Sequence, residues 1–190
     1  MMARLLAALC IAAALLASAP APAETIRIGV LKFGTVAWEL DTMRHHGLDA
    51  KHGVTVEAVA FAGEDASAIA FRAGAVDIIV SDWMEVARLR AEGEAISFAP
   101  YSASMGAIMV PGPSPIRTLA DLKGVRLAVA GGPYDKGWLL LQAMAGQNGA
   151  ALATDNAIVY GAPPLLAEKL REGEFDVALN YWQYNARLEA

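Results

Sequence analysis

Aromatic residues, glycines and carboxylates cluster in short stretches that each follow an apolar, strand-like run of the sequence. All four tryptophans belong to these stretches. An aromatic ring offers flat stacking surface and holds a cation against its face, and glycine lets a ligand approach the backbone closely. We predict a ligand site there that contains the following residues: Phe33, Gly34, Thr35, Trp38, Ser81, Asp82, Trp83, Gly131, Gly132, Tyr134, Asp135, Trp138, Asn180 and Trp182.

Several of these residues also have an ordinary structural interpretation. A tryptophan after a strand packs a helix N-terminus against a sheet as readily as it lines a pocket. Asp82 stands where an N-cap residue would accept hydrogen bonds from the following helix. The glycine pair before Pro133 is equally compatible with a plain strand-to-helix turn. The sequence leaves both interpretations open for these positions.

The residue types needed for catalysis or metal binding are scarce. The single cysteine, Cys10, lies in the apolar N-terminal segment, and two of the three histidines, His45 and His46, are adjacent and point to different sides of a helix. Neither a dinucleotide-binding glycine motif nor a phosphate-binding P-loop occurs. We therefore predict no catalytic residues, no metal, no cofactor and no enzymatic activity.

The charge balance disfavours one class of partner, and the N-terminus indicates an exported protein. The chain has 15 Lys and Arg against 20 Asp and Glu, which disfavours nucleic acid as a partner. Arg4, the apolar run from Leu5 to Ala19 and the sequence Ala21-Pro22-Ala23 are typical of a cleavable signal peptide over residues 1–23. We expect a mature protein that starts at Glu24 and resides in the periplasm.

Short β-branched runs alternate with segments of helical periodicity, which is typical of an α/β fold with mainly parallel sheets. The predicted strands are Ile26 to Leu31, Val54 to Phe61, Val76 to Val80, Ile96 to Tyr101, Ala107 to Val110, Val125 to Ala130, Ala157 to Tyr160 and Phe175 to Asn180. The predicted helices are Trp38 to His46, Asp65 to Arg72, Trp83 to Glu92, Trp138 to Gln147, Leu165 to Arg171 and Trp182 to the end.

The alternation breaks between Tyr101 and Pro115, where two strand-like runs follow each other and a proline-rich turn comes next. We place a domain crossing there, with lobe 1 over residues 24–103 and lobe 2 over residues 104–190. After the turn, Thr118 is expected to cap a short helical turn that runs through Leu122. The sequence ends inside an amphipathic segment without a helix stop signal, so we expect a C-terminally truncated second lobe.

Four stretches resemble the periplasmic substrate-binding proteins of ABC importers for nitrate, taurine, alkanesulfonates and thiamine-precursor pyrimidines. The most specific of them opens the second lobe and is similar to the family's I-x-S/T-L-x-D-L-K-G pattern. Gly173 to Ala178 also repeats the pattern of Gly74 to Asp77. The four stretches are Ile26 to Val30, His46 to Val54, Gly74 to Asp77 and Ile116 to Gly124.

The resemblance implies a two-lobed periplasmic-binding-protein type II fold that lacks its second crossing and C-terminal part here. It also implies a monomer that captures a small solute between its lobes and delivers it to an ABC transporter permease. The loop after Val129 departs from the Ser/Thr-rich loop of the small-anion members, so we expect an aromatic or heteroaromatic organic solute. The alternatives are a pyrimidine-synthesis-like enzyme or a periplasmic sensor domain on the same fold.

Overall fold

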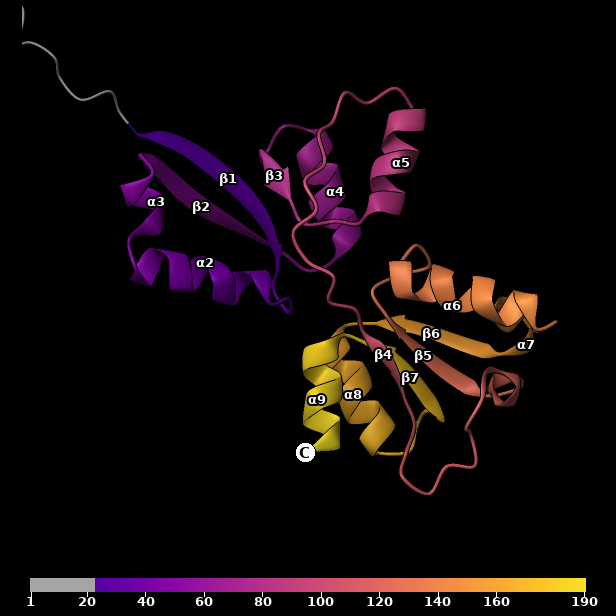
Figure 1. Cartoon of the computed structure of the whole chain (residues 1–190). Helices are drawn as coiled ribbons and strands as arrows, with labels where there is room; N and C mark the ends of the chain where they lie inside the picture. The colour runs from indigo at the N-terminus through magenta and orange to yellow at the C-terminus, as the bar shows by residue number, and fades with distance from the viewer. Residues whose placement is uncertain (1–22) are drawn as a thin grey trace, which may run out of the picture.

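The computed structural model describes residues 23–190, which form two β-sheets with helices packed on them (Figure 1). The predicted signal peptide therefore lies outside the described residues, except for its last position. Lobe 1 here denotes the first sheet with its helices. Its elements are β1 (Glu24–Leu31), α2 (Val36–His45), α3 (Leu48–Lys51), β2 (Val54–Phe61), α4 (Glu64–Arg72), β3 (Ile78–Ile79) and α5 (Trp83–Ala91).

Lobe 2 denotes the second sheet with its helices, drawn from rose through orange to yellow in Figure 1. Its elements are β4 (Ala107–Met109), the 3-10 helix η1 (Leu119–Leu122), β5 (Arg126–Ala130), α6 (Lys136–Gln147), α7 (Leu152–Asp155), β6 (Ala157–Gly161), α8 (Pro163–Arg171), β7 (Val177–Asn180) and α9 (Trp182–Glu189).

The sheet of lobe 1 has the order β2-β1-β3, and all its strands are parallel. Alternate residues of β1 face opposite helices, as the two-residue period of a strand requires. Val30 packs with Leu40 of α2 and Val56 of β2. Gly29 faces the other side, where a Cβ atom would come within 3.1 Å of the Ser67 hydroxyl of α4. The buried core of this lobe is small.

The sheet of lobe 2 has the order β4-β7-β5-β6 and contains the larger core. Strand β5 again alternates: Leu127 and Val129 pack toward Trp138 of α6, whereas Ala128 packs toward Leu166 of α8. Strands β5, β6 and β7 are parallel, and only β4 runs antiparallel to its neighbour β7. Because both faces of β5 are covered, four of its five residues are buried.

The same ion pair occurs at corresponding places in both sheets. Arg27 of β1 binds Asp77, which precedes β3, and Arg126 of β5 binds Asp176, which precedes β7. In each pair the backbone N–H of the arginine also donates to the aspartate, over 2.8 Å. Adding 99 to the residue numbers of the first pair gives the second. The two lobes therefore repeat one β-α pattern.

The predicted α/β class with mainly parallel sheets is confirmed, and most predicted elements are present. The predicted strand from Ile96 to Tyr101 is wrong, because residues 94–106 have no regular structure and pair with no sheet edge. Strand β3 is only two residues long. Thr118 caps η1 as predicted, through a reciprocal capping box with Asp121.

Candidate ligand-binding site between the lobes

A cavity of about 290 Å³ lies between the two lobes, where the parallel strands end and helices begin. Ligands of open parallel sheets bind at this edge, because the turns and helix N-termini there present backbone groups and side chains to a crevice. Lobe 1 contributes the turns after β1 and β2, and lobe 2 contributes those after β5, β6 and β7. The lining residues are Leu31, Phe33, Ala62, Gly63, Glu64, Asp65, Gly131, Gly132, Tyr134, Asp135, Tyr160, Gly161, Ala162, Pro163 and Tyr181.

Corresponding turns of the two lobes face each other across this cavity. Gly63 is the N-cap of α4 in lobe 1, and Ala162 is the N-cap of α8 in lobe 2. The first helical residues are Glu64 and Pro163, so a carboxylate on one side stands opposite a ring without charge on the other. The walls of the cavity are thus alike in backbone but different in chemistry.

Three contacts join the lobes beside the cavity. The Tyr181 hydroxyl donates a hydrogen bond to Glu64 Oε1 over 3.3 Å. Gln183 Nε2, which is nearly buried, donates to the backbone oxygen of Phe33 over 2.9 Å. Trp38 and Trp182 meet edge to face, with their ring centroids 6.3 Å apart. The first residues of α9 therefore contact lobe 1 directly.

The titratable groups of the cavity have perturbed pKa values. Glu64 keeps an exposed surface, yet the protein around it removes enough solvation to raise its pKa to about 7. The negative charges of Asp135 and Asp82 raise it further, and the hydrogen bond from Tyr181 opposes them. Burial also raises the pKa of Asp135 and that of Tyr181. A cavity with such groups is a candidate functional site on physical grounds.

Two of the predicted carboxylates cap helices. Asp82 accepts hydrogen bonds from the backbone N–H groups of Met84 and Glu85 over 2.7 and 3.0 Å, which confirms its predicted N-cap role on α5. Asp135 accepts from the N–H of Trp138 over 3.0 Å and caps α6. Both carboxylates are therefore fixed in position by the helix that each one begins.

Five of the predicted site residues line the cavity. They are Phe33, Gly131, Gly132, Tyr134 and Asp135. Gly34, Thr35 and Trp38 lie beside it at the start of α2, and Ser81, Asp82 and Trp83 lie at the start of α5. Trp182 begins α9 and contacts Trp38 rather than the cavity. The binding roles of these residues remain predictions.

Two predicted site residues belong to the interior instead. Trp138 is only 1% exposed and packs in the core of lobe 2, because the face of α6 that carries it lies on β5. Asn180 is equally buried, and its amide donates to the backbone oxygen of Pro163 while its side-chain oxygen accepts from the N–H of Tyr181. Their placement in the predicted site was wrong, because burial and structural hydrogen bonds occupy both side chains.

The sequence argument missed the lining residues that follow the second and sixth strands. These are Ala62 to Asp65 after β2, and Gly161 to Pro163 at the end of β6 and the start of α8. The rule applied to the other strand ends would have identified them, since both stretches also lead from a parallel strand into a helix. The aromatic surface of the cavity consequently comes from phenylalanine and tyrosine, and none of the tryptophans, all of which are described, lines it.

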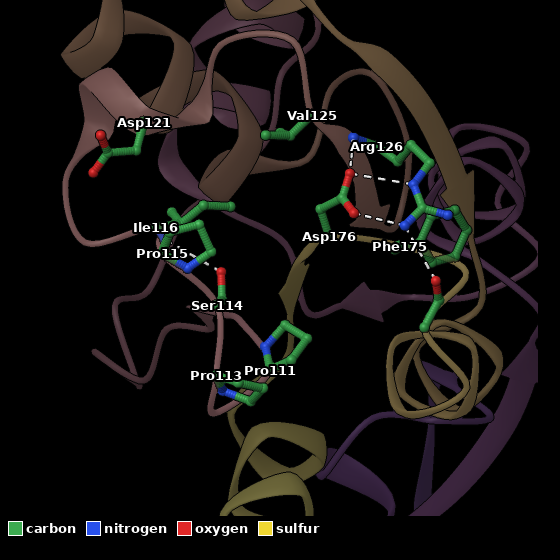
Figure 2. A pocket seen from close by; sticks show the side chains of 11 residues that line it. Pro111, Pro113, Ser114, Pro115, Ile116, Asp121, Val125, Arg126, Phe175 and Asp176 are labelled. Carbon is green, nitrogen blue, oxygen red and sulfur yellow. Dashed lines mark hydrogen bonds and ion pairs between the residues drawn. The ribbon is translucent and has the colours of Figure 1, made fainter.

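A larger and more open cavity of about 590 Å³ lies at the opposite end of lobe 2, under the proline-rich turn (Figure 2). Its lining includes Arg126 and Asp176, which bind each other as shown by the dashed lines. Arg126 also donates to the backbone oxygen of Gly173. Since Arg126 is already bound by Asp176 and all the lining residues belong to lobe 2, the cavity between the lobes is the better candidate site.

Comparisons with known proteins give a family and a fold. A sequence model of the family described as "ABC transporter, phosphonate, periplasmic substrate-binding protein" matches residues 46–189. The periplasmic aliphatic sulphonate binding protein SsuA from Escherichia coli is similar in structure, with 24% identity and a TM-score of 0.65 over 88% of this chain and 58% of its own. No curated protein sequence matches significantly.

Two further solved structures are similar. The alkanesulfonate-binding protein SsuA from Xanthomonas axonopodis pv. citri, bound to MOPS, has 23% identity and a TM-score of 0.69 over 90% of this chain and 58% of its own. The methionine-binding protein MetQ has 19% identity and a TM-score of 0.53, covering 87% of this chain and 74% of its own. The likeness confirms the predicted periplasmic-binding-protein fold, and the chain spans 58% of the length of either SsuA protein.

Proposed function

Because the chain belongs to the family of periplasmic substrate-binding proteins of phosphonate ABC transporters, we propose that it is the solute-binding component of an ABC importer. In this proposal a small organic solute is held between the two lobes and delivered to the transporter permease. The observation that supports it is the cavity at the strand ends, to which both lobes contribute corresponding turns. A solute that contacts both walls favours the closed arrangement of the lobes over an open one.

The aromatic lining supports a flat organic solute. Phe33, Tyr134, Tyr160 and Tyr181 all contribute surface to the cavity, and rings of this kind bind planar apolar groups by stacking. A solute with an oxyanion is the second candidate, since the family description names phosphonate and two similar structures are sulfonate-binding proteins. In both cases we expect the solute to be released chemically unchanged.

The proposal places the protein in the periplasm as a monomer. The segment of residues 1–23 serves as the export signal, and export is tested by the mass of the mature protein, which should begin at Glu24. Within the residues that the structure describes, no helix has the length and apolar character needed to cross a membrane. Light scattering of the purified protein should give the mass of one chain.

Tryptophan fluorescence and thermal melting against a library of metabolites test the receptor function. A bound solute should shift the emission, because Trp38 and Trp182 lie at the contact between the lobes. Tyr134→Ala should weaken binding of any hit by on the order of 1 kcal/mol, whereas Phe98→Ala, an exposed ring outside the cavity, should not. If no solute changes emission or melting temperature, the receptor function is wrong, and conversion of a hit into product would indicate an enzyme instead.

A further inference from the structure

The charged side chains that line the cavity between the lobes are all acidic. They are Glu64, Asp65 and Asp135, and no Lys, Arg or His is among the lining residues within residues 23–190. Asp82 stands close enough for its charge to raise the pKa of both Glu64 and Asp135. The cavity wall is therefore a region of concentrated negative charge.

Helix N-termini ordinarily attract anions, but two of those near the cavity are occupied by the protein's own carboxylates. The N–H groups at the start of α6 are bound by Asp135, and those at the start of α5 by Asp82. Helix α4 begins with Glu64 and Asp65, so its positive end faces two carboxylates. Helix α8 begins with Pro163, which has no N–H to offer. An incoming oxyanion would find the donors of α5 and α6 taken, would find no donor on the first residue of α8, and would meet like charges at the start of α4.

The cavity carboxylates form no salt bridge, unlike several other acidic residues of the protein. Asp77 and Asp176 each bind an arginine, and Glu85, Glu92 and Glu168 do the same on helix surfaces. Within residues 23–190 no salt bridge involves Glu64, Asp65, Asp82 or Asp135. Lys136 acts on Asp135 only through the longer-range field, and the effect of burial outweighs it. No basic side chain among residues 23–190 neutralises them, and a cationic ligand would supply the opposite charge.

We propose that the solute carried between the lobes has a positively charged amine or quaternary ammonium group, which Glu64, Asp65 and Asp135 bind while Tyr134 and Tyr181 cover its apolar part. The proposal rests on the receptor function proposed above and specifies its substrate class. Carboxylates supply the charge that a cation requires, and ring faces attract a cation that has lost part of its water. An oxyanion is disfavoured by the same charges.

Three probes of one shape and different charge test this inference: 2-phenylethylamine, 2-phenylethanol and 2-phenylethanesulfonate. Titration calorimetry of the purified protein at pH 8 should show the amine binding at least about tenfold more tightly than the alcohol, and the sulfonate binding most weakly. Equal affinities, tighter binding of the sulfonate, or no binding of the amine at millimolar concentration would overturn the cationic class. The receptor function would still stand if a library solute of another class stabilised the protein.

Substitutions identify the groups responsible. Glu64→Gln and Asp65→Asn should each reduce affinity for the amine about tenfold and leave that for the alcohol unchanged, because they remove charge at nearly constant volume. Asp41→Asn, an exposed carboxylate on α2 outside the cavity, is the matched control and should change neither. Loss of alcohol binding in the cavity variants would indicate a change of shape rather than of charge, and equal amine affinity in all variants would contradict the proposal.

The pH dependence adds a second readout. Glu64 faces Asp135, Asp82, Asp65 and the Tyr181 hydroxyl, and its pKa of about 7 means that it loses its proton between pH 6 and pH 8. The amine stays protonated over this range, so its affinity should rise with pH in the native protein and stay flat in Glu64→Gln. A pH-independent affinity in the native protein would exclude Glu64 as a ligand of the cation.

Discussion

Trp38 and Trp138 occupy the same position in the two lobes, yet their surroundings differ completely. Each is the third residue of the helix that follows the first parallel strand of its lobe, α2 in one case and α6 in the other. Trp138 is 1% exposed and lies in the core, whereas Trp38 is 54% exposed and meets Trp182 of the other lobe. The repeated β-α pattern determines the position of a residue in the fold, and the packing around its side chain determines its role.

The cores of the two lobes differ in the same way. Lobe 2 buries both faces of β5 under α6 and α8, while lobe 1 has one small cluster and leaves Ile69, Ile78 and Val80 exposed. Burial of apolar surface is the main favourable contribution to folding. We therefore expect lobe 2 to provide most of the stability of this chain, and lobe 1 to respond weakly to substitutions at corresponding positions.

The tryptophan pair gives the largest expected difference. Trp138→Ala should lower the free energy of unfolding by about 3–5 kcal/mol, because it leaves a cavity in a closed core. Trp38→Ala should lower it by less than about 1 kcal/mol, since most of the ring already contacts water. Urea denaturation followed by circular dichroism measures both. Equal losses of unfolding free energy in the two variants would contradict the expectation that lobe 2 provides most of the stability.

The antiparallel strand β4 distinguishes lobe 2 from the described part of lobe 1 and depends on a glycine. A Cβ atom at Gly106 would overlap the backbone oxygen of Asn180, so Gly106→Ala should disturb the pairing of β4 with β7. We expect a loss of about 1–3 kcal/mol in the same denaturation experiment. Gly112→Ala is the matched control, because no atom lies within 4 Å of its added carbon. A neutral Gly106→Ala would mean that β4 shifts freely.

The first residues of α4 and α8 differ in charge, because Glu64 titrates and Pro163 does not. The pKa of Glu64 is raised to about 7 in the folded protein, so its contribution to stability declines as pH rises through that value. Glu64→Gln should therefore stabilise the protein at pH 8, by on the order of 1 kcal/mol after solvent screening, and have no effect near pH 4. Melting temperatures of the two proteins between pH 4 and pH 8 measure this. A constant difference across the range would contradict it.

The repeated ion pairs should show the smallest effect and no difference between lobes. The Arg27 guanidinium holds the pKa of Asp77 at about 2, and Arg126 lowers the pKa of Asp176 in the same way. Each pair should contribute stability above the ordinary aspartate pKa and lose it as pH falls toward 2. Asp77→Asn and Asp176→Asn should each reduce the loss of stability on acidification. This reduction should be smaller than each of the effects predicted above. A clear inequality between the two variants would mean that the pairs differ in function.

The strand and helix pattern predicted the fold, because parallel strands buried on both faces leave an unmistakable apolar signature at Val125 to Ala130. The same pattern failed at Ile96 to Tyr101, where an apolar run has strand-like composition but no neighbouring edge to pair with. The composition of a segment indicates whether it can form a strand. Whether it does so depends on a pairing strand that lies far away in the sequence. A single sequence carries little information on such pairing.

The lining of the cavity between the lobes was predicted in part for a similar reason. The rule that ligands bind after parallel strands grouped Phe33, Gly131, Gly132, Tyr134 and Asp135, which do line one cavity, and their binding roles stay predictions. It offered no means of telling which face of α6 Trp138 would take, and residue type favoured the wrong one. Glu64 has no distinctive motif, and its pKa is raised first by burial and then by the charges of Asp135 and Asp82, which lie far from it in the sequence.

The facing turns of the two lobes also bear on how such a cavity changes over evolution. Each wall belongs to a separate copy of one β-α unit, held by its own ion pair. A new charge at the start of α8 would change the chemistry of one wall, while the residues of the opposite wall stay the same. Ligand specificity in this architecture therefore depends on two walls that can change by separate substitutions. One wall can acquire new side chains while the other keeps its contacts with the ligand.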